Sequence, residues 1–221
     1  MGQRSQLYIR YRNKKTLVAM HLQWNYGFYM INRTYQLLDY IKKNVENSYS
    51  NFKEEHFDIA NSGSYREDLD ILHNLIQMNL TIGSYVGGHD LVKEAKQWGD
   101  YTTGDTFKID PEFQDNNNGI LVIDVLEDGT IKYGLGAGPE DVGKDEVYKM
   151  TTASEYFKIS QKNLTGEYEK YRLENCNKEL YDKVLEQIEF IDNNFTLLTQ
   201  EEYKDIFNQE YEYKNCLKEN N

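Results

Sequence analysis

The sequence predicts an α+β fold. Two segments, one before Trp24 and one over about 120–135, have the period of two residues or the apolar run that is typical of β-strands. Elsewhere apolar residues recur every three or four positions, as they do along the buried face of a helix. We therefore expect an N-terminal β-hairpin followed by a long helix, a central second hairpin, and a helical C-terminal third.

The N-terminal hairpin is predicted from residues 6–24. Leu7, Ile9 and Tyr11 fall on one face of its first strand. A short polar turn then leads into a second strand at 16–24, where apolar residues resume. The N-terminus therefore has the pattern of two antiparallel strands.

A long helix is predicted to start near Tyr26, where the period changes to three and four residues, and to end at the polar run 47–51. A second helix is expected over about 65–80, and Asp90 is a candidate N-cap for a short helix that runs to Trp98. The apolar face of the long helix comprises Met30, Leu37, Leu38, Ile41 and Val45.

The second hairpin is predicted over 120–135, where Asp128 and Gly129 form a strong turn signal between two apolar segments. The glycines at 134–138 could cradle a phosphate, but they lack the spacing of a dinucleotide fingerprint and acidic residues follow at once. We interpret them as the end of a strand or a loop. Pro139 is then expected to begin a helix whose first turn is acidic.

The C-terminal third is charged and helical. Thr152 with Glu155, and Thr199 with Glu202, both fit the capping box that begins a helix. Between them one long amphipathic helix is predicted, with an apolar stripe of Leu173, Cys176, Leu180, Val184, Ile188, Ile191 and Phe195. We expect a single domain over 1–221 in which 150–221 forms a helical subdomain.

Charge is unevenly distributed along the 221 residues, whose net charge is −12. Residues 1–50 carry eight basic side chains against two acidic ones, which gives +6 there and −18 for the remainder. An acidic body repels nucleic acid, so direct nucleic-acid binding is not expected. A basic protein, such as one that itself holds nucleic acid, is the favoured partner. The alternative is that the acidity only maintains solubility.

Nothing in the sequence predicts a membrane segment, a metal or a cofactor. No basic opening is followed by an apolar run, and no stretch approaches the roughly 18 apolar residues of a spanning helix, so we expect a cytoplasmic protein. Neither cysteine lies in a metal-binding spacing, and no two histidines lie four residues apart. The four histidines are His21, His56, His73 and His89.

One segment combines a histidine, a carboxylate and flexible backbone. His89 and Asp90 follow Gly87 and Gly88 directly, which makes this segment the candidate pocket of a small enzyme or nucleotide-binding protein. A packed or exposed histidine is the competing interpretation. Because the sequence contains no nucleophile elbow and no phosphate-binding loop with its lysine, it assigns no catalytic residue, and it favours binding over catalysis.

The densest aromatic cluster lies where the first hairpin meets the first helix. Trp24, Asn25, Tyr26 and Tyr29, together with Phe28, could seal the core at this corner. The alternative is that they form a recognition surface for a partner. We keep both interpretations, and the second makes Trp24, Asn25, Tyr26 and Tyr29 the predicted binding residues.

The same stretch, Gln-Trp-Asn-Tyr-Gly at 23–27, resembles a motif in small uncharacterised phage and prophage proteins of low-GC Gram-positive bacteria. Their second strand ends in His-Trp-Asp-Gly-Tyr-Pro, so this chain has glutamine for histidine, asparagine for aspartate, and no proline. The opening at 2–6 is similar to prophage openings as well. The resemblance covers about the first fifty residues and implies a mobile-element origin without any catalytic residue.

These observations predict an accessory protein of a phage or prophage that acts by binding a host protein. An acidic inhibitor of a host defence nuclease, of the anti-CRISPR or anti-restriction type, fits the charge, because carboxylates can occupy places where phosphates dock. The alternative function is a small enzyme or nucleotide-binding protein that uses the glycine-rich loops at 83–88 or 134–138.

Overall fold

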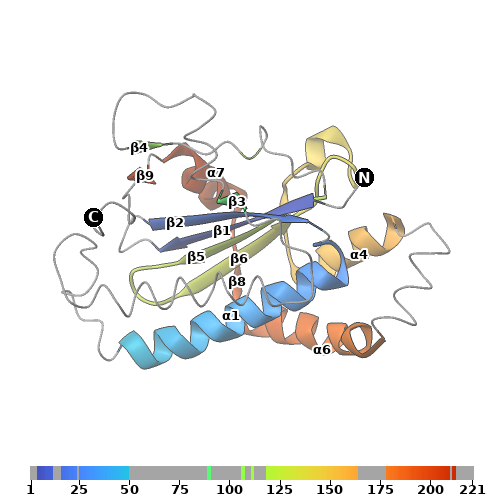
Figure 1. Ribbon diagram of the computed structural model, residues 1–221, viewed down its shortest axis with the longest axis horizontal. Coiled ribbons are helices and arrows are strands. Elements are labelled where there is room, and N and C mark those ends of the chain that lie inside the picture. The colour runs from blue at the N-terminus through green and yellow to red at the C-terminus, as the bar shows by residue number, and fades with distance from the viewer. Residues whose placement is uncertain are drawn as a thin grey trace.

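The computed structural model describes residues 4–11, 16–23, 25–49, 89–90, 106–107, 111, 118–163, 178–209 and 211–212. The helices within these ranges are α1 (Phe28–Tyr49), α4 (Ala153–Asn163), α6 (Lys178–Asn194) and α7 (Gln200–Asn208), with a short 3-10 helix, η3 (Lys144–Glu146). Figure 1 shows that they flank a central sheet. The fold class is α+β, as the sequence predicts.

Two hairpins make up most of the sheet. The first joins β1 (Arg4–Tyr11) to β2 (Thr16–Gln23), and the second joins β5 (Ile120–Val125) to β6 (Ile131–Gly136). β1 pairs with β5 in parallel, which places the two hairpins side by side. The strands of both hairpins lie where the sequence predicts them, and in the turn between β5 and β6 Gly129 supplies a positive φ of 86°.

Short strands extend the sheet, whose order is β3-β2-β1-β5-β6-β7, with β8 also paired to β6. A separate antiparallel pair is formed by β4 and β9. The short strands are β3 (His89–Asp90), β4 (Thr106–Phe107), β7 (Met150–Thr151), β8 (Thr196–Leu197) and β9 (Tyr211–Glu212).

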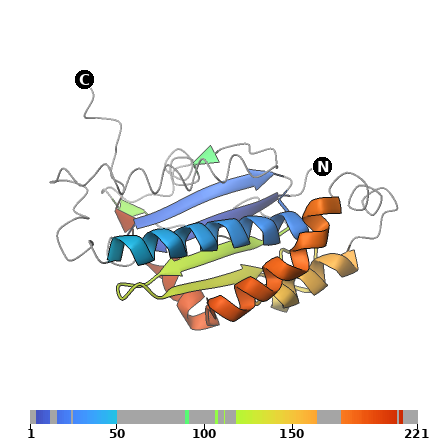
Figure 2. The ribbon, with the colours of Figure 1, turned by 90° about the horizontal axis from the view of Figure 1, so that it is seen from below.

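One face of the sheet is covered by α1, α4 and α6, which lie together in Figure 2. Alternation along the strands sends Leu7, Ile123 and Tyr133 to this face. α4 and α6 contribute to the same core as the N-terminal hairpin. The buried apolar side chains of these two helices, with Phe195 directly after α6, are Ala153, Tyr156, Phe157, Val184, Ile188, Ile191 and Phe195.

The opposite face is covered by α7 and by the segment before β7. Its apolar cluster is smaller and shares no residue with the first. The buried members are Tyr8, Ile120, Val122, Tyr148, Met150, Leu198, Tyr203 and Ile206. The sheet therefore separates two cores of unequal size.

Both predicted capping boxes are present. Thr199 Oγ1 accepts from the backbone N–H of Glu202, and the Glu202 carboxylate accepts from the backbone N–H of Thr199. Thr152 and Glu155 make the same reciprocal pair at the start of α4. The long helix α1 also has the predicted extent, and its residues Met30, Leu37, Leu38 and Ile41 are buried.

One predicted element differs from the structure, and others lie outside the described residues. The chain after Pro139 makes a single turn, in which the backbone N–H groups of Asp141 and Val142 both approach Gly138 O, and no α-helix follows. Gly143 is extended and ends this turn. The helix expected over 65–80, and the one expected after Asp90, lie outside the described residues, whereas Asp90 itself belongs to β3.

The buried stripe of α6 can be tested by one substitution on each side of the helix. Ile188 is buried and Glu186 is exposed. Ile188→Asp should cost several kcal/mol, because it places an unpaired charge in the core. Glu186→Ala should change the free energy of unfolding by less than about 0.5 kcal/mol. Urea denaturation of both variants measures this difference, and equal tolerance would contradict the packing of α6.

Candidate functional site

The structure places the predicted aromatic motif in the connection between β2 and α1. Trp24 lies outside the described residues. Asn25 is fully buried, Tyr26 is 5% exposed, and Tyr29 is partly exposed and packs against Phe28. Burial at Asn25 and Tyr26 agrees with the core interpretation of these two positions, while a binding role for the motif stays a prediction.

The side chain of Asn25 connects β1 to α1. Its side-chain amide donates to Ser5 Oγ in β1 at 2.9 Å and lies 3.1 Å from Met30 Sδ in α1. Its carbonyl oxygen accepts from Arg33 Nε at 2.9 Å. Arg33 is fully buried, and this burial lowers its pKa to about 10. Asn25 therefore helps to satisfy a buried cation while it joins α1 to the sheet.

Tyr26 connects the start of α1 to α4 and to the turn after β6. Its hydroxyl donates to Asp141 Oδ1 at 2.9 Å and lies 3.4 Å from Ser160 O. Its ring meets that of Tyr156 edge-on, with 6.4 Å between the centroids. Burial raises the pKa of Tyr156 well above its ordinary value, so this phenol stays neutral. Tyr26 therefore packs its ring against Tyr156 and binds polar atoms of neighbouring segments with its hydroxyl group.

Removing the Asn25 amide should destabilise the fold. Asn25→Ala deletes the acceptor of buried Arg33 Nε and the donor to Ser5, and an unsatisfied buried group costs about 1–3 kcal/mol. Chemical denaturation measures the loss. Asn193→Ala, on the exposed surface of α6, is the matched control and should change stability little. A stable Asn25→Ala variant would contradict this structural role.

The structure describes two of the four residues in the candidate pocket of the small-enzyme hypothesis. Gly87 and Gly88 lie outside the described residues, and His89 and Asp90 form β3. β3 is antiparallel to β2, so His89 stands opposite His21 and Asp90 opposite Met20. The structure thus brings two of the four histidines to neighbouring strands, a pairing that their separation in sequence could not reveal.

The glycines of the second hairpin are explained by packing. Gly134 and Gly136 belong to β6. A Cβ atom on Gly134 would lie 2.5 Å from Met150 Sδ, and one on Gly136 would lie 2.9 Å from Tyr148 Cα. Tyr148 itself has a positive φ of 54°. These glycines admit close contact with Tyr148 and with Met150 of β7, which agrees with the strand interpretation.

A row of charges crosses the sheet beneath α7, and sequence reasoning missed it. Arg10 on β1 is the register partner of Asp124 on β5, which is the register partner of Lys132 on β6. Arg10 is 2% exposed and Asp124 is fully buried. The one signal in the sequence is an aspartate inside the apolar strand 120–125, which is unusual for a residue type that is rarely buried without a partner.

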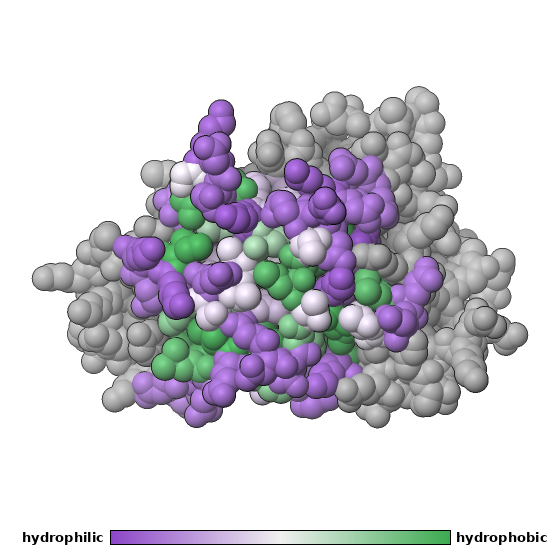
Figure 3. Space-filling model, turned by 180° about the vertical axis from the view of Figure 1, so that it is seen from behind, coloured by the Kyte–Doolittle hydropathy of each residue, from purple (hydrophilic) through white to green (hydrophobic). Residues whose placement is uncertain are grey.

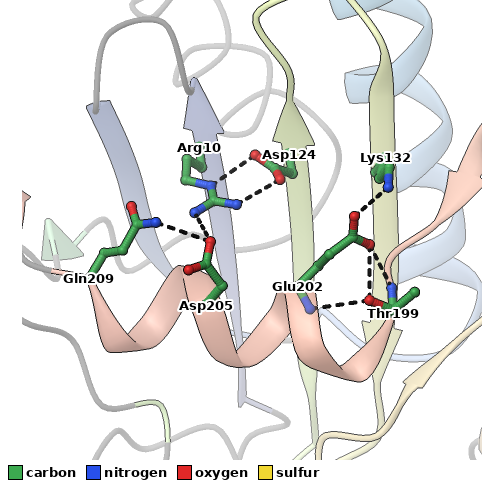
Figure 4. A network of polar contacts seen from close by, with 7 residues as sticks. All are labelled: Arg10, Asp124, Lys132, Thr199, Glu202, Asp205 and Gln209. Atoms are coloured by element: carbon green, nitrogen blue, oxygen red, sulfur yellow. Dashed lines mark hydrogen bonds and ion pairs between the residues drawn. The ribbon is translucent and has the colours of Figure 1, made fainter.

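Figure 4 shows how α7 completes this row. Arg10 donates to both Asp124 oxygens, from Nε at 2.9 Å and from Nη2 at 2.8 Å, while Nη1 donates to Asp205 Oδ2 at 3.1 Å. Lys132 pairs with Glu202. Glu202 also belongs to the capping box, and Gln209 Nε2 donates to Asp205 at 3.0 Å. Each charged side chain in this row therefore has an oppositely charged partner, and the row lies between the sheet and α7.

The pKa of Glu202 gives the Lys132 pair a defined pH dependence. Burial alone would raise this pKa, but the hydrogen bonds from Lys132 and Thr199 outweigh burial, so the pKa lies below its ordinary value of 4.5. The ionised carboxylate therefore stabilises the fold above about pH 4.5, and this contribution is lost as the pH falls through the folded-state pKa.

We expect Glu202→Gln to lower Tm at about pH 6 and to matter less and less as the pH falls through the folded-state pKa of Glu202, because the wild-type side chain then loses its charge as well. Thermal denaturation across this pH range measures the difference in Tm between variant and wild type. A difference that does not depend on pH would mean that the charge of Glu202 contributes nothing to stability.

The exposed surface of α6 is acidic. Asp182, Glu186 and Glu189 are exposed at helical spacing, and Leu185 between them is 67% exposed. Leu185 is the one large apolar side chain that is exposed among the described residues. We call these four residues the α6 acidic face. Hydrophilic side chains also dominate the described surface seen in Figure 3, with smaller hydrophobic areas between them.

Within the described ranges, no three His, Cys, Asp or Glu side chains lie close enough to hold a metal ion. The same part of the chain contains no helix with the length and apolar character needed to cross a bilayer. No protein-family model, curated protein or solved structure matches the chain.

Proposed function

We propose that the chain is a phage or prophage accessory protein that acts in the host cytoplasm by binding a basic surface of a host protein, such as a defence nuclease. The observation that supports this function is the α6 acidic face, where three carboxylates surround an exposed leucine.

The geometry of α6 suits contact with arginine or lysine side chains. Residues three and four apart lie on one side of a helix, so Asp182, Glu186 and Glu189 present their carboxylates in one direction. Guanidinium groups bind carboxylates as they bind phosphates, by donating paired hydrogen bonds to their oxygens. A surface that normally holds nucleic acid is therefore a suitable target.

Leu185 adds an apolar contact to this charged surface. Salt screens exposed charge pairs and limits what they contribute to affinity, and protein interfaces commonly bury an apolar centre inside a polar rim. Opposite charge would mainly speed association and orient the partner. The α6 acidic face offers both features on one helix.

The binding test starts with affinity capture from the lysate of a low-GC Gram-positive host, followed by measurement of affinity for the captured protein. Neutralising the face with Asp182→Asn, Glu186→Gln and Glu189→Gln should weaken binding about tenfold, or ~1.4 kcal/mol. Affinity should also fall steeply between about 50 and 500 mM salt, because exposed charge pairs are screened.

The matched control removes the same number of negative charges elsewhere on the exposed surface, through Glu127→Gln, Asp145→Asn and Glu146→Gln. It should leave affinity nearly unchanged. Equal loss from both triple variants would show that net charge matters and the α6 acidic face does not. Binding that does not respond to salt would remove the electrostatic basis of the proposal.

A further inference from the structure

The two faces of the sheet are covered in physically different ways. The α1, α4 and α6 side buries a large apolar cluster, whereas α7 covers a smaller one to which it contributes Tyr203 and Ile206. The two clusters share no residue. Contacts that hold α7 can therefore be lost without removing any apolar contact from the larger core.

Two ion pairs join α7 to the sheet, beside the apolar contacts of Tyr203, Ile206 and Phe207. Glu202 and Asp205, three residues apart on one side of the helix, meet Lys132 and Arg10. Asp124 lies between these cations in the cross-strand row, and Asp128 in the β5–β6 turn is a further charge near Lys132.

Ion pairs of this kind contribute to holding a helix in place only while both partners are charged. Desolvating an ion pair offsets much of its attraction, so such a pair stabilises less than apolar groups of the same size would. Neutralising Glu202 would leave the partly buried Lys132 ammonium without this partner, whereas Arg10 would keep its pair with Asp124 when Asp205 is neutralised. A helix of nine residues is also too short to persist alone in water. Tertiary contacts, both ionic and apolar, must therefore hold α7 in place.

We propose that α7 is a strap held over the second face of the sheet by charge, which opens as one unit when Glu202 and Asp205 are neutralised while α1 and α6 stay packed on the other face. Its opening would uncover Tyr8, Arg10 and Lys132, an aromatic ring and two cations that α7 covers in the closed state. This inference is independent of the α6 acidic face.

The test is amide hydrogen exchange at neutral pH on the double variant Glu202→Gln with Asp205→Asn. Glutamine can still serve in a capping box, so the substitutions remove charge and keep the helix start. Amides of residues 203–207 should exchange at least about tenfold faster than in the wild type, because local opening becomes more frequent. Amides of 184–191 in α6 should change less than about twofold.

The matched control is Glu155→Gln with Asp145→Asn. Glu155 fills the same capping-box position at α4, and Asp145 is an exposed aspartate. Neither has an ion pair to the sheet among the described residues, so α7 should exchange as in the wild type. Equal acceleration of α7 and α6 in the test variant, including complete unfolding, would overturn the proposal. Unchanged exchange of α7 would overturn it as well, because the apolar cluster alone would then hold the helix.

Discussion

The parallel pairing of β1 with β5 is the constraint on which the rest of the structure depends. It joins segments 114 residues apart and places both hairpins in one sheet. Because side chains alternate along a strand, a slip of one residue would move Arg10 and Asp124 into the apolar core beneath α1. The buried pair between these two residues has matched geometry only in the observed register. Polar pairing thus specifies an alignment that apolar strands alone would leave less certain.

Buried polar groups perform a related task in the helical layer. Arg33 on α1 reaches Asn25, which in turn reaches Ser5 on β1. Across the helix pair, Gln187 Nε2 donates to Asn32 Oδ1 at 2.8 Å. These contacts lie within the largest apolar cluster, where a shifted helix would leave each polar group unsatisfied at a cost of about 1–3 kcal/mol. They favour one placement of α1 among the several that its apolar stripe would accept.

Local patterns were enough to predict the longer strands and helices among the described residues, but not the short strands β3, β4, β7, β8 and β9. Alternation located both hairpins, the three-and-four period located α1 and α6, and reciprocal threonine and glutamate pairs located the starts of α4 and α7. What could not be predicted depends on contacts between distant segments. Nothing near Arg10 indicates that Asp124 and Asp205 will meet it, and nothing near His21 indicates His89. The turn after Pro139 also depends on such contacts, because the chain must return there to pair β7 with β6.

The fold also determines which of the charged side chains are exposed on the surface. The sequence gives its first fifty residues a net charge of +6, but Arg10 and Arg33 are both buried, and Arg10 is neutralised by Asp124. Two of the eight basic side chains that suggest a positive lobe are thus withdrawn from the surface. The acidic residues of α6 remain exposed. The field that a partner meets is therefore more negative than the N-terminal sequence suggests, because the fold uses cations to hold its strands and helices in place and leaves carboxylates in water.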